Sequence, residues 1–431
     1  MRVDRRTLLR GLGAGATLAA FRADALARVG EAAKAVAGRA PGAVAADEAY
    51  WFEIAQAFDV DRTLVNLNNG GCSPAPAHVL NAMIQDLRFS NEIPVYHMWT
   101  VLEPRIESCR RELAAEFGCD PEEMAITRNA SESLETLIFG IDLKPGDEVI
   151  YTTQNYPRMI TSWEQRARRD GVVLKPITFP VPPKSGAEVV ARFRAAITPR
   201  TRVIEVTHIT NLTGQILPVR DIVRLGREHG IEVFVDGAHA FAQFPFKRDD
   251  LECDYYATSL HKWLFAPIGT GFLYVRKNKI RGIWPLMAAP AKMDDDIRKF
   301  EEIGTHPAAN HNAIAAAMAF HRGIGAARKA ARLRWLRDRW ALRLAAADPR
   351  VTILTPLNDT DACGIALISI AGFDTNKLQA YLWDKHRIMT TPIVHDEFQG
   401  LRITPNVYTS ADEIDVFCGR MEQTLKTGLP A

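Results

Sequence analysis

The chain has 431 residues, of which 47% are hydrophobic and 24% charged, and its formal net charge at pH 7 is +2. This length allows two domains with substantial cores, and the composition is that of an ordinary globular protein. A net charge so close to zero gives no reason to expect a nucleic-acid partner. Beyond the N-terminal segment, no apolar run is long enough to predict a stable membrane span.

The N-terminal residues have the pattern of an export signal. Arg5 and Arg6 precede a short apolar stretch rich in glycine and alanine, and small residues alternate near its end. Adjacent arginines before a weakly apolar middle favour a twin-arginine signal over residues 1–27, which predicts recognition by the twin-arginine export machinery and a periplasmic location. An ordinary basic N-terminus is the alternative. Residues 28–48 are rich in alanine and predict a helix or a linker.

Alternating strand and helix patterns then predict an α/β domain. Between residues 120 and 280, short β-branched runs alternate with amphipathic segments, which is typical of a largely parallel sheet that binds ligands beyond the carboxyl ends of its strands. A helix over 221–229 is expected to end at Gly230. The expected strands span residues 148–152, 172–177, 202–206, 232–235, 255–258 and 272–275.

The C-terminal part predicts a smaller α+β domain. A single long helix, rich in arginine and alanine, is expected over 313–347, and its basic face is interpreted as solvated. A strand over 365–370, a helix over 375–385, a strand over 401–403 and a closing helix from about Ala411 follow. The expected domains are an N-terminal arm over 49–75, a large domain over 76–305 and a small domain over 306–431.

Two motifs at the ends of neighbouring expected strands carry the chemistry. A buried carboxylate at Asp236 needs a cationic partner, such as a protonated pyridine nitrogen, although capping of the next helix is an alternative. Beyond a later strand, desolvation of Lys262 favours a neutral amine that condenses with an aldehyde, and Ser259 and His261 can bond a phosphate. A surface location is commoner for a lone lysine, but the spacing from Asp236 favours a reactive one.

The stretch from Asp236 to Lys277, with SLHKWLFAPIGTGFLYVRK inside it, resembles the class V aminotransferases of pyridoxal-phosphate fold type I, and most of all their isopenicillin N epimerase-like branch. The resemblance runs from about Asn66 to the C-terminal helix. It implies an α/β large domain with a mostly parallel seven-stranded sheet and a smaller α+β C-terminal domain. It also implies the cofactor pyridoxal 5′-phosphate, bound as a Schiff base to Lys262.

The same resemblance implies roles for further residues. Ala130 and Ser131 correspond to the turn at a helix N-terminus whose N–H groups hold the cofactor's phosphate. Tyr156 lies where relatives carry a histidine or another aromatic ring that stacks on the pyridine, so that an acid/base role for it stays open. Asn211 and His239 match the residues that touch the cofactor's phenolic oxygen. Taken without the family, each of these is equally an ordinary core, cap or turn residue.

Three more positions concern the substrate and the subunit contact. Arg402 matches the arginine that binds the substrate's α-carboxylate as a planar, bidentate pair. Asn69 lies in a glycine-containing loop that is expected beside the substrate. Thr305 matches a segment that reaches the phosphate of the neighbouring subunit, which implies a homodimer. No metal site is expected, because no cysteines have the spacing of metal ligands.

The resemblance leaves the reaction at the substrate's Cα open. Amino transfer is the first expectation, and the alternatives are epimerisation of an amino acid or peptide and elimination from Cβ. A non-catalytic binding protein on the same fold is the remaining alternative, although every position that the chemistry requires is filled.

Two features bear on the substrate. Cysteine desulfurases of this class carry a nucleophilic cysteine ahead of the carboxylate-binding arginine, whereas residues 386–400 contain none, so desulfuration by that mechanism is not expected. The combination of an export signal with this family resembles an exported enzyme of siderophore maturation. A peptide or another secondary metabolite is therefore expected as a substrate class beside free amino acids.

Overall fold

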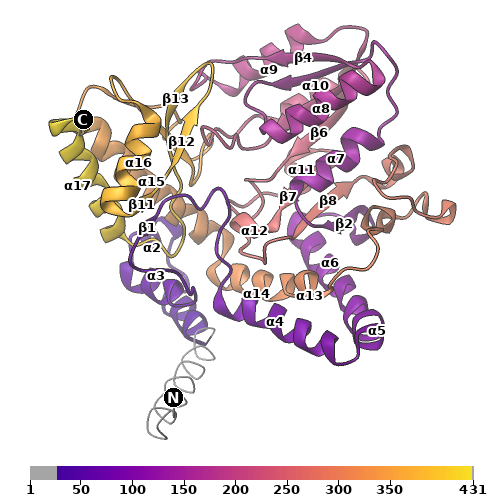
Figure 1. The fold of residues 1–431 in the computed structure, drawn as a ribbon, viewed down its shortest axis with the longest axis horizontal. Coiled ribbons are helices and arrows are strands. Elements are labelled where there is room, and N and C mark those ends of the chain that lie inside the picture. The colour runs from indigo at the N-terminus through magenta and orange to yellow at the C-terminus, as the bar shows by residue number, and fades with distance from the viewer. Residues whose placement is uncertain (1–26, 430–431) are drawn as a thin grey trace, which may run out of the picture.

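The computed structural model describes residues 27–429, which form a large α/β body and a smaller body beside it (Figure 1). All but the last residue of the expected export signal therefore lies outside the described residues. Among residues 27–429, no helix combines the length and the apolarity that crossing a membrane requires.

A seven-stranded sheet forms the centre of the large body, in the order β2-β8-β7-β6-β5-β3-β4. The five strands β3, β4, β5, β6 and β7 run parallel to one another, whereas β8 is antiparallel to both of its neighbours, β2 and β7. The mostly parallel sheet predicted from the sequence is confirmed, and so are the six expected strands. The strands are β2 (Met124–Thr127), β3 (Glu148–Thr152), β4 (Val173–Ile177), β5 (Thr201–Thr207), β6 (Glu232–Asp236), β7 (Tyr255–Ser259) and β8 (Gly271–Val275).

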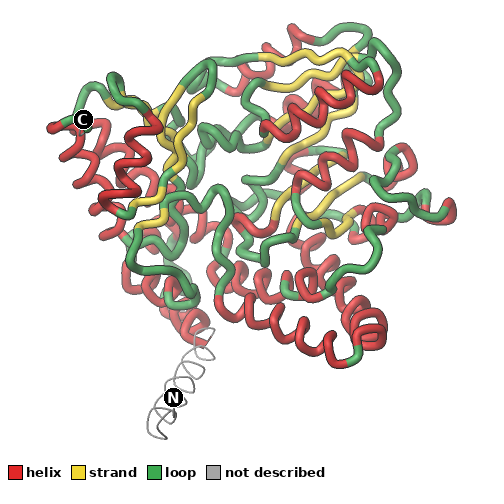
Figure 2. The backbone as a smooth tube through the Cα atoms, viewed as in Figure 1, coloured by secondary structure: helices red, strands yellow, loops and turns green. Residues whose placement is uncertain are grey.

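Alternate side chains of this sheet enter two separate apolar clusters, one on each face. Val233 and Val235 belong to the cluster that contains α10, whereas Phe234 between them belongs to the cluster of α7 and α8. Strands that are apolar on both faces are typical of a parallel sheet covered by helices, and Figure 2 shows the red helices around the yellow strands. The longer helices of this body are α4 (Ala77–Glu92), α6 (Glu103–Phe117), α7 (Ala130–Gly140), α8 (Pro157–Asp170), α9 (Gly186–Ala196) and α10 (Val219–Glu228).

Shorter helical segments connect these elements. The α-helical ones are α5 (Pro94–Tyr96), α11 (Arg248–Leu251), α12 (Leu260–Trp263) and α13 (Ala309–Asn312). A π-helical turn, η1 (His97–Leu102), joins α5 to α6. The 3₁₀ turns are η2 (Pro121–Glu123), η3 (Lys277–Gly282), η4 (Ala291–Met293) and η5 (Ile297–Glu301).

The helical pattern over 313–347 forms two helices, so the prediction of a single long helix was wrong. Gly325, with a φ of 88°, separates α14 (Ile314–Ile324) from α15 (Ala326–Ala347). The two helices have different neighbours, because α14 contacts α4 and α6 while α15 contacts α2 (Pro41–Ala45) and α17 (Ala411–Thr427). Glycine accepts a positive φ at such a break without steric cost.

The smaller body contains a four-stranded antiparallel sheet in the order β12-β13-β10-β9. Its own apolar cluster joins the sheet to α15 and the C-terminal helix. A separate parallel pair links β1 of the N-terminal arm to β11. The elements are β1 (Val65–Asn66), β9 (Val351–Ile353), β10 (Ala366–Ile370), α16 (Thr375–His386), β11 (Ile388–Met389), β12 (Thr391–Val394), β13 (Gln399–Ile403) and α17 (Ala411–Thr427).

The segment expected as a helix or linker, residues 28–48, is mostly helical. Residues 27–35 form a helix, and α2 (Pro41–Ala45) and α3 (Glu48–Ala55) follow. Arg332 of α15 donates to the carbonyl oxygen of Ala45 at 2.9 Å, and the indole of Trp51 is buried between these helices and α15. This segment is therefore part of the folded protein and covers one side of α15.

Candidate active site

One cavity of about 460 Å³ lies at the carboxyl ends of β5, β6 and β7. Parallel strands present these ends at one edge of the sheet, where α/β proteins bind their ligands. Side chains of the large body form most of the wall, and β13 of the smaller body contributes Arg402. The residues predicted from the sequence that line this cavity are Ala130, Ser131, Tyr156, Asn211, Asp236, His239, Ser259, His261, Lys262 and Arg402.

Lys262 lies in the short helix α12, directly after β7. Its Nζ lies 3.0 Å from Nε2 of His239. Removal from water lowers the pKa of Lys262 to about 8, with the charge of Asp236 acting in the opposite direction and that of Arg402 reinforcing the shift. The amine therefore loses its proton more readily than a surface lysine does, and the neutral form is a nucleophile.

Asp236 is the last residue of β6 and is almost completely buried. One carboxylate oxygen accepts the backbone N–H of Ala238 at 2.9 Å. Burial raises the pKa of Asp236, and the Ala238 N–H and the charge of Lys262 counteract that shift. Within residues 27–429 no cation forms an ion pair with this carboxylate, although a buried anion needs one. The site thus presents an incompletely paired negative charge to a ligand.

Several buried polar atoms around Lys262 lack a hydrogen-bond partner within residues 27–429. They are Nδ1 of His239, Oδ1 of Asn211 and Oγ1 of Thr207. Burial and the neighbouring cations hold the pKa of His239 well below its usual range, so that the imidazole is neutral. While Lys262 is protonated, its ammonium donates to Nε2, which leaves the imidazole proton on Nδ1. Unpartnered buried groups are uncommon in folded proteins, and here they gather in one ligand-sized cavity.

The N-terminus of α7 forms the anion-binding side of the cavity. Asn129 caps this helix by accepting the N–H of Glu132 at 2.8 Å, and the N–H of Ala130 donates to Oγ of Ser259 at 3.0 Å. The Ser259 hydroxyl keeps its own proton for a ligand. Gly271 of β8 is required here, because a Cβ at this position would lie 2.7 Å from Cα of Asn129. The positive end of a helix dipole and the N–H groups at a helix start favour an anion such as phosphate.

Tyr156 stands at the N-terminus of α8 and is 38% exposed on the cavity wall. The preceding residue, Asn155, is buried and donates to Oε1 of Glu205 at 2.8 Å. Trp163 donates to the other oxygen of Glu205 at 2.6 Å, and burial raises the pKa of that carboxyl to about 7. The buried carboxyl of Glu205 therefore holds Asn155 in place and with it the backbone that carries Tyr156.

Arg402 is 6% exposed and its guanidinium is held from two sides. One terminal nitrogen donates to the carbonyl oxygen of Asn211 at 2.8 Å, and the other donates to Oδ1 of Asn68 at 3.0 Å. Its Nε has no partner within the described chain, and burial lowers the pKa of Arg402 to about 10. A fixed guanidinium with an unused donor, paired with no carboxylate of residues 27–429, is suited to a carboxylate ligand.

Two of the predicted site residues do not line this cavity. Asn69 is fully buried, and its amide bonds the carbonyl oxygens of Asn66 and Thr404 at 3.0 Å each, while Gly70 and Gly71 form the wall. Thr305 lies apart from the cavity, close after η5. Its contact with a neighbouring subunit stays a prediction.

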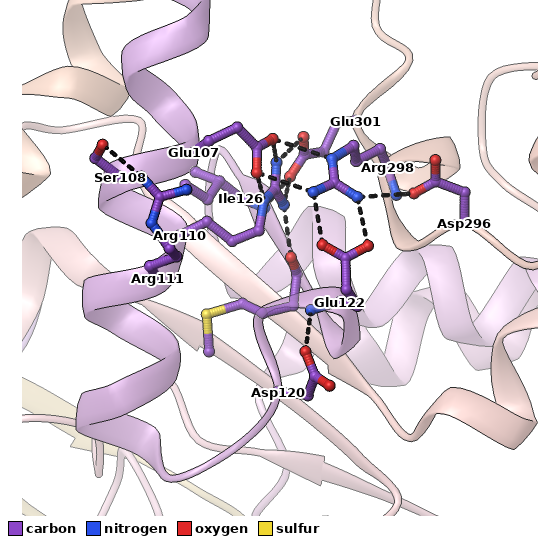
Figure 3. Close-up of polar contacts among 11 residues, drawn as sticks. Glu107, Ser108, Arg110, Arg111, Asp120, Glu122, Ile126, Asp296, Arg298 and Glu301 are labelled. Atoms are coloured by element: carbon purple, nitrogen blue, oxygen red, sulfur yellow. Dashed lines mark hydrogen bonds and ion pairs between the residues drawn. The ribbon is translucent and has the colours of Figure 1, made fainter.

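An ion-pair cluster fastens the segment that leads to Thr305 (Figure 3). Arg110 of α6 is 1% exposed, and Nη2 donates to Glu301 of η5 at 2.8 Å. Glu301 also accepts the backbone N–H of Ile126 in β2, and Arg298 joins the cluster through Glu107 at 2.9 Å. The cluster therefore connects η5 to both a helix and the edge strand of the large sheet.

Sequence reasoning missed several residues that shape the cavity. Thr207 and Arg158 line it, Asn68 holds Arg402, and Glu205 supports Asn155. Thr207 could have been found, because it ends β5 and pairs in register with Asp236. Asn68 belongs to the glycine-containing loop that was expected beside the substrate, but its pairing with Arg402 gave no such signal, since the two residues lie 334 positions apart.

Residues 65–395 match the family described as Aminotransferase class-V. The chain is 30% identical over 382 residues to an isopenicillin N epimerase of Streptomyces clavuligerus, and this alignment covers 85% of the chain and 96% of the relative. It is 28% identical over 394 residues to an isopenicillin N epimerase of Amycolatopsis lactamdurans, covering 87% of the chain and 98% of the relative.

Among solved structures, an apo cysteine desulfurase of Thermococcus onnurineus NA1 resembles this protein with a TM-score of 0.76 and 21% sequence identity. The superposition covers 87% of this chain and 98% of that one. This likeness confirms the fold predicted from the sequence, that of the large sheet with a smaller C-terminal body.

Proposed function

The chain belongs to the aminotransferase class-V family of pyridoxal-phosphate enzymes, and from that premise we propose that it removes and returns a proton at the Cα of an amino-acid or peptide-type substrate. One observation carries the proposal. A single cavity brings together a lysine with a lowered pKa, a buried carboxylate and a buried guanidinium, and neither of these two charges forms an ion pair within residues 27–429.

The residues of the cavity fit pyridoxal phosphate. Asp236 would hold the protonated ring nitrogen, and the start of α7 with Ser259 would hold the phosphate. The free Nδ1–H of His239 is a donor for the phenolic oxygen. When bound, the cofactor supplies an aldehyde that condenses with amines and a ring that withdraws electron density from the substrate's Cα.

The protein's own groups then orient the substrate and move its proton. Arg402 binds the α-carboxylate, because its Nε and terminal N–H groups form the fork that a carboxylate matches. Lys262 exchanges a proton at Nζ, and a pKa of about 8 lets the same amine accept and release it near neutral pH. His239 accepts a hydrogen bond from that amine and keeps it in place.

Epimerisation is the outcome that we place first, ahead of amino transfer. Its support is that two isopenicillin N epimerases align with 96% and 98% of their lengths. Inverting a stereocentre by a two-base route needs a second proton-carrying group at the face of Cα opposite Lys262, and the phenol of Tyr156, which lines the same cavity, is the group that we propose for it. Amino transfer, the first expectation from the sequence, needs only Lys262.

The test is proton NMR in deuterated water with the purified holoenzyme and both enantiomers of amino acids and short peptides. Epimerisation gives deuterium at Cα in both enantiomers, whereas amino transfer gives a keto product and elimination a loss of the Cβ substituent. Y156F is expected to exchange the Cα proton of one enantiomer without inverting it, and K262A to lose all turnover. Absence of Cα exchange with every substrate would contradict the proposal.

We further propose that the enzyme is a homodimer. Several large apolar side chains of the described residues are solvent-exposed in the single chain, namely Ile93, Val95, Tyr96, Trp99, Trp284 and Met287. Exposed aromatic and large aliphatic side chains are typical of a protein interface. Sedimentation of the holoenzyme should give twice the chain mass, and T305A should weaken cofactor retention if Thr305 serves the partner's site.

Export to the periplasm is also a proposal, and the adjacent Arg5 and Arg6 support it. Fusion of residues 1–27 to a reporter that is active only after folding in the cytoplasm tests it. Export of the reporter, and its loss when both arginines become lysines, is the expected result. A reporter that stays in the cytoplasm would contradict the proposal.

A further inference from the structure

A second lysine, outside the cavity, lies buried behind the segment that carries Lys262. Lys329 of α15 has an exposed fraction of 0%, and its Nζ donates to the carbonyl oxygen of Trp263. The same nitrogen lies 3.8 Å from the centroid of the Phe265 ring and 3.4 Å from Nδ1 of His321. No carboxylate of residues 27–429 forms an ion pair with it, although burying an amine without a counter-charge is costly.

The segment that Lys329 contacts is itself unusual. Trp263 is the last residue of α12, a helix of four residues whose third residue is Lys262. Two residues later, Phe265 has a φ of 66°. For a residue with a side chain, this backbone conformation costs about 1–2 kcal/mol, so surrounding contacts must hold it. The carbonyl of Trp263 and the ring of Phe265, both in this segment, are in contact with the Lys329 amine.

We propose that Lys329 is a positioning residue for Lys262: its amine caps α12 and holds the strained turn from Trp263 to Phe265, which keeps Nζ of Lys262 against His239. The aromatic ring and the carbonyl oxygen offer the amine partial negative charge in place of a carboxylate. Burial holds the pKa of Lys329 well below its usual range and also that of His321. The imidazole is therefore neutral, and its Nδ1 lies within hydrogen-bond distance of the amine.

The chain provides a matched control for this role. Lys299 of η5 is 4% exposed and donates to two carbonyl oxygens, those of Ile280 at 2.8 Å and Asp294 at 2.9 Å. It is thus a second buried lysine that binds backbone carbonyls, but neither it nor its acceptors line the cavity. Its replacement reports the cost of losing a buried structural lysine without moving Lys262.

The experiment compares K329M and K299M with the natural protein after the cofactor has been removed from the full chain. Pyridoxal phosphate is added at a series of pH values, the product on Lys262 is reduced with borohydride, and the mass increase is followed over time. No substrate takes part, so failure here is distinguishable from failure of the proposed reaction. The titratable and charged groups that face Lys262 are unchanged in both variants, namely Asp236, Arg402, Cys72 and His239.

In K329M we expect the pH midpoint of trapping to rise by about half to one unit, because a displaced Lys262 regains water and with it a more ordinary pKa. The trapping rate should fall about tenfold or more, since small misplacements of a nucleophile are costly. K299M should lose thermal stability and keep the pH midpoint and the trapping rate of the natural protein. K329Q, whose amide can still donate to Trp263, should restore part of the rate and keeps the test usable if K329M fails to fold. A K329M protein with unchanged midpoint and rate would overturn the proposal and leave Lys329 a structural residue only.

Discussion

Replacing Arg402 with methionine should lower kcat/KM roughly 10²–10⁴-fold and leave the stability of the protein almost unchanged. Burial lowers the pKa of Arg402 from 12.5 to about 10, and a depression of roughly two to three units corresponds to about 3 kcal/mol. The folded state binds this proton less tightly than the unfolded chain does, so the charge lowers stability at every pH below about 10. The hydrogen bonds to Asn211 and Asn68 return about 1 kcal/mol each. R402M removes both contributions, and the free energy of unfolding should change by no more than about 1 kcal/mol.

The substrate, in contrast, loses its anchor. Two charge-assisted hydrogen bonds to the substrate's carboxylate contribute about 3–6 kcal/mol of binding free energy. Their loss in R402M lowers kcat/KM roughly 10²–10⁴-fold. R402K keeps the charge but not the planar fork, and its kcat/KM should lie between those of the natural enzyme and R402M.

The assay combines denaturant unfolding of the holoenzyme with single-turnover mixing against an amino acid. R337M is the matched control, because Arg337 is also fully buried but lies outside the cavity and pairs with Asp338 at 2.8 Å. It should lower stability and leave kcat/KM unchanged. A loss of more than about 3 kcal/mol of stability in R402M, or activity within tenfold of the natural enzyme, would refute the reasoning.

Three further predictions concern the frame of the site. G237A would place a Cβ 2.0 Å from Cζ of Tyr256, so we expect a loss of about 1–3 kcal/mol with weaker cofactor retention, measured by thermal unfolding and by dialysis. E301Q leaves the buried Arg110 with a weakened partner and should cost about 3 kcal/mol in denaturant unfolding; an unchanged midpoint would mean that the cluster in Figure 3 contributes little. Hydrogen bonding to arginines lowers the pKa of Glu107 from 4.5 to about 2, so its contribution is present above pH 4.5 and is lost as the pH falls towards 2. E107Q should therefore flatten the stability profile in that interval, and an identical acid limb would contradict the assignment.

Local patterns were enough to predict the framework of the site. Asp236 and Lys262 each follow a strand that is apolar on both faces, and such strands are recognisable without any knowledge of their neighbours. Because parallel strands bring their carboxyl ends together, the two residues were expected at one edge, and both line the cavity. The seven-stranded sheet and the place of Arg402 at the substrate were expected only from the family resemblance.

What could not be predicted depends on contacts between distant parts of the chain. The pairing of Asn68 with Arg402 spans 334 residues, and that of Lys329 with Trp263 spans 66. Neither pair belongs to a periodic pattern, so each residue taken alone reads as an ordinary surface or helix residue. The helix break at Gly325 was not predicted for a related reason. A glycine inside a helical pattern costs only about 1 kcal/mol, and the break became visible only when α14 and α15 were seen to contact different helices.

The charges of the cavity together imply that ligand binding stabilises the folded protein. Asp236 lacks an ion-pair partner within residues 27–429, Arg402 lacks one as well, and the amine of Lys262 is bonded only to a neutral imidazole. Each group is strained electrostatically in the free protein, as the shifts of their pKa values away from the charged forms indicate. A cationic ring nitrogen and a substrate carboxylate would relieve two of these costs at once. Cofactor binding must therefore stabilise the folded state, by about 2.7 kcal/mol when the free cofactor is a hundredfold above its Kd. Since that stabilisation acts through Asp236, a D236A protein should gain much less from added pyridoxal phosphate than the natural enzyme, even where Lys262 still captures the aldehyde.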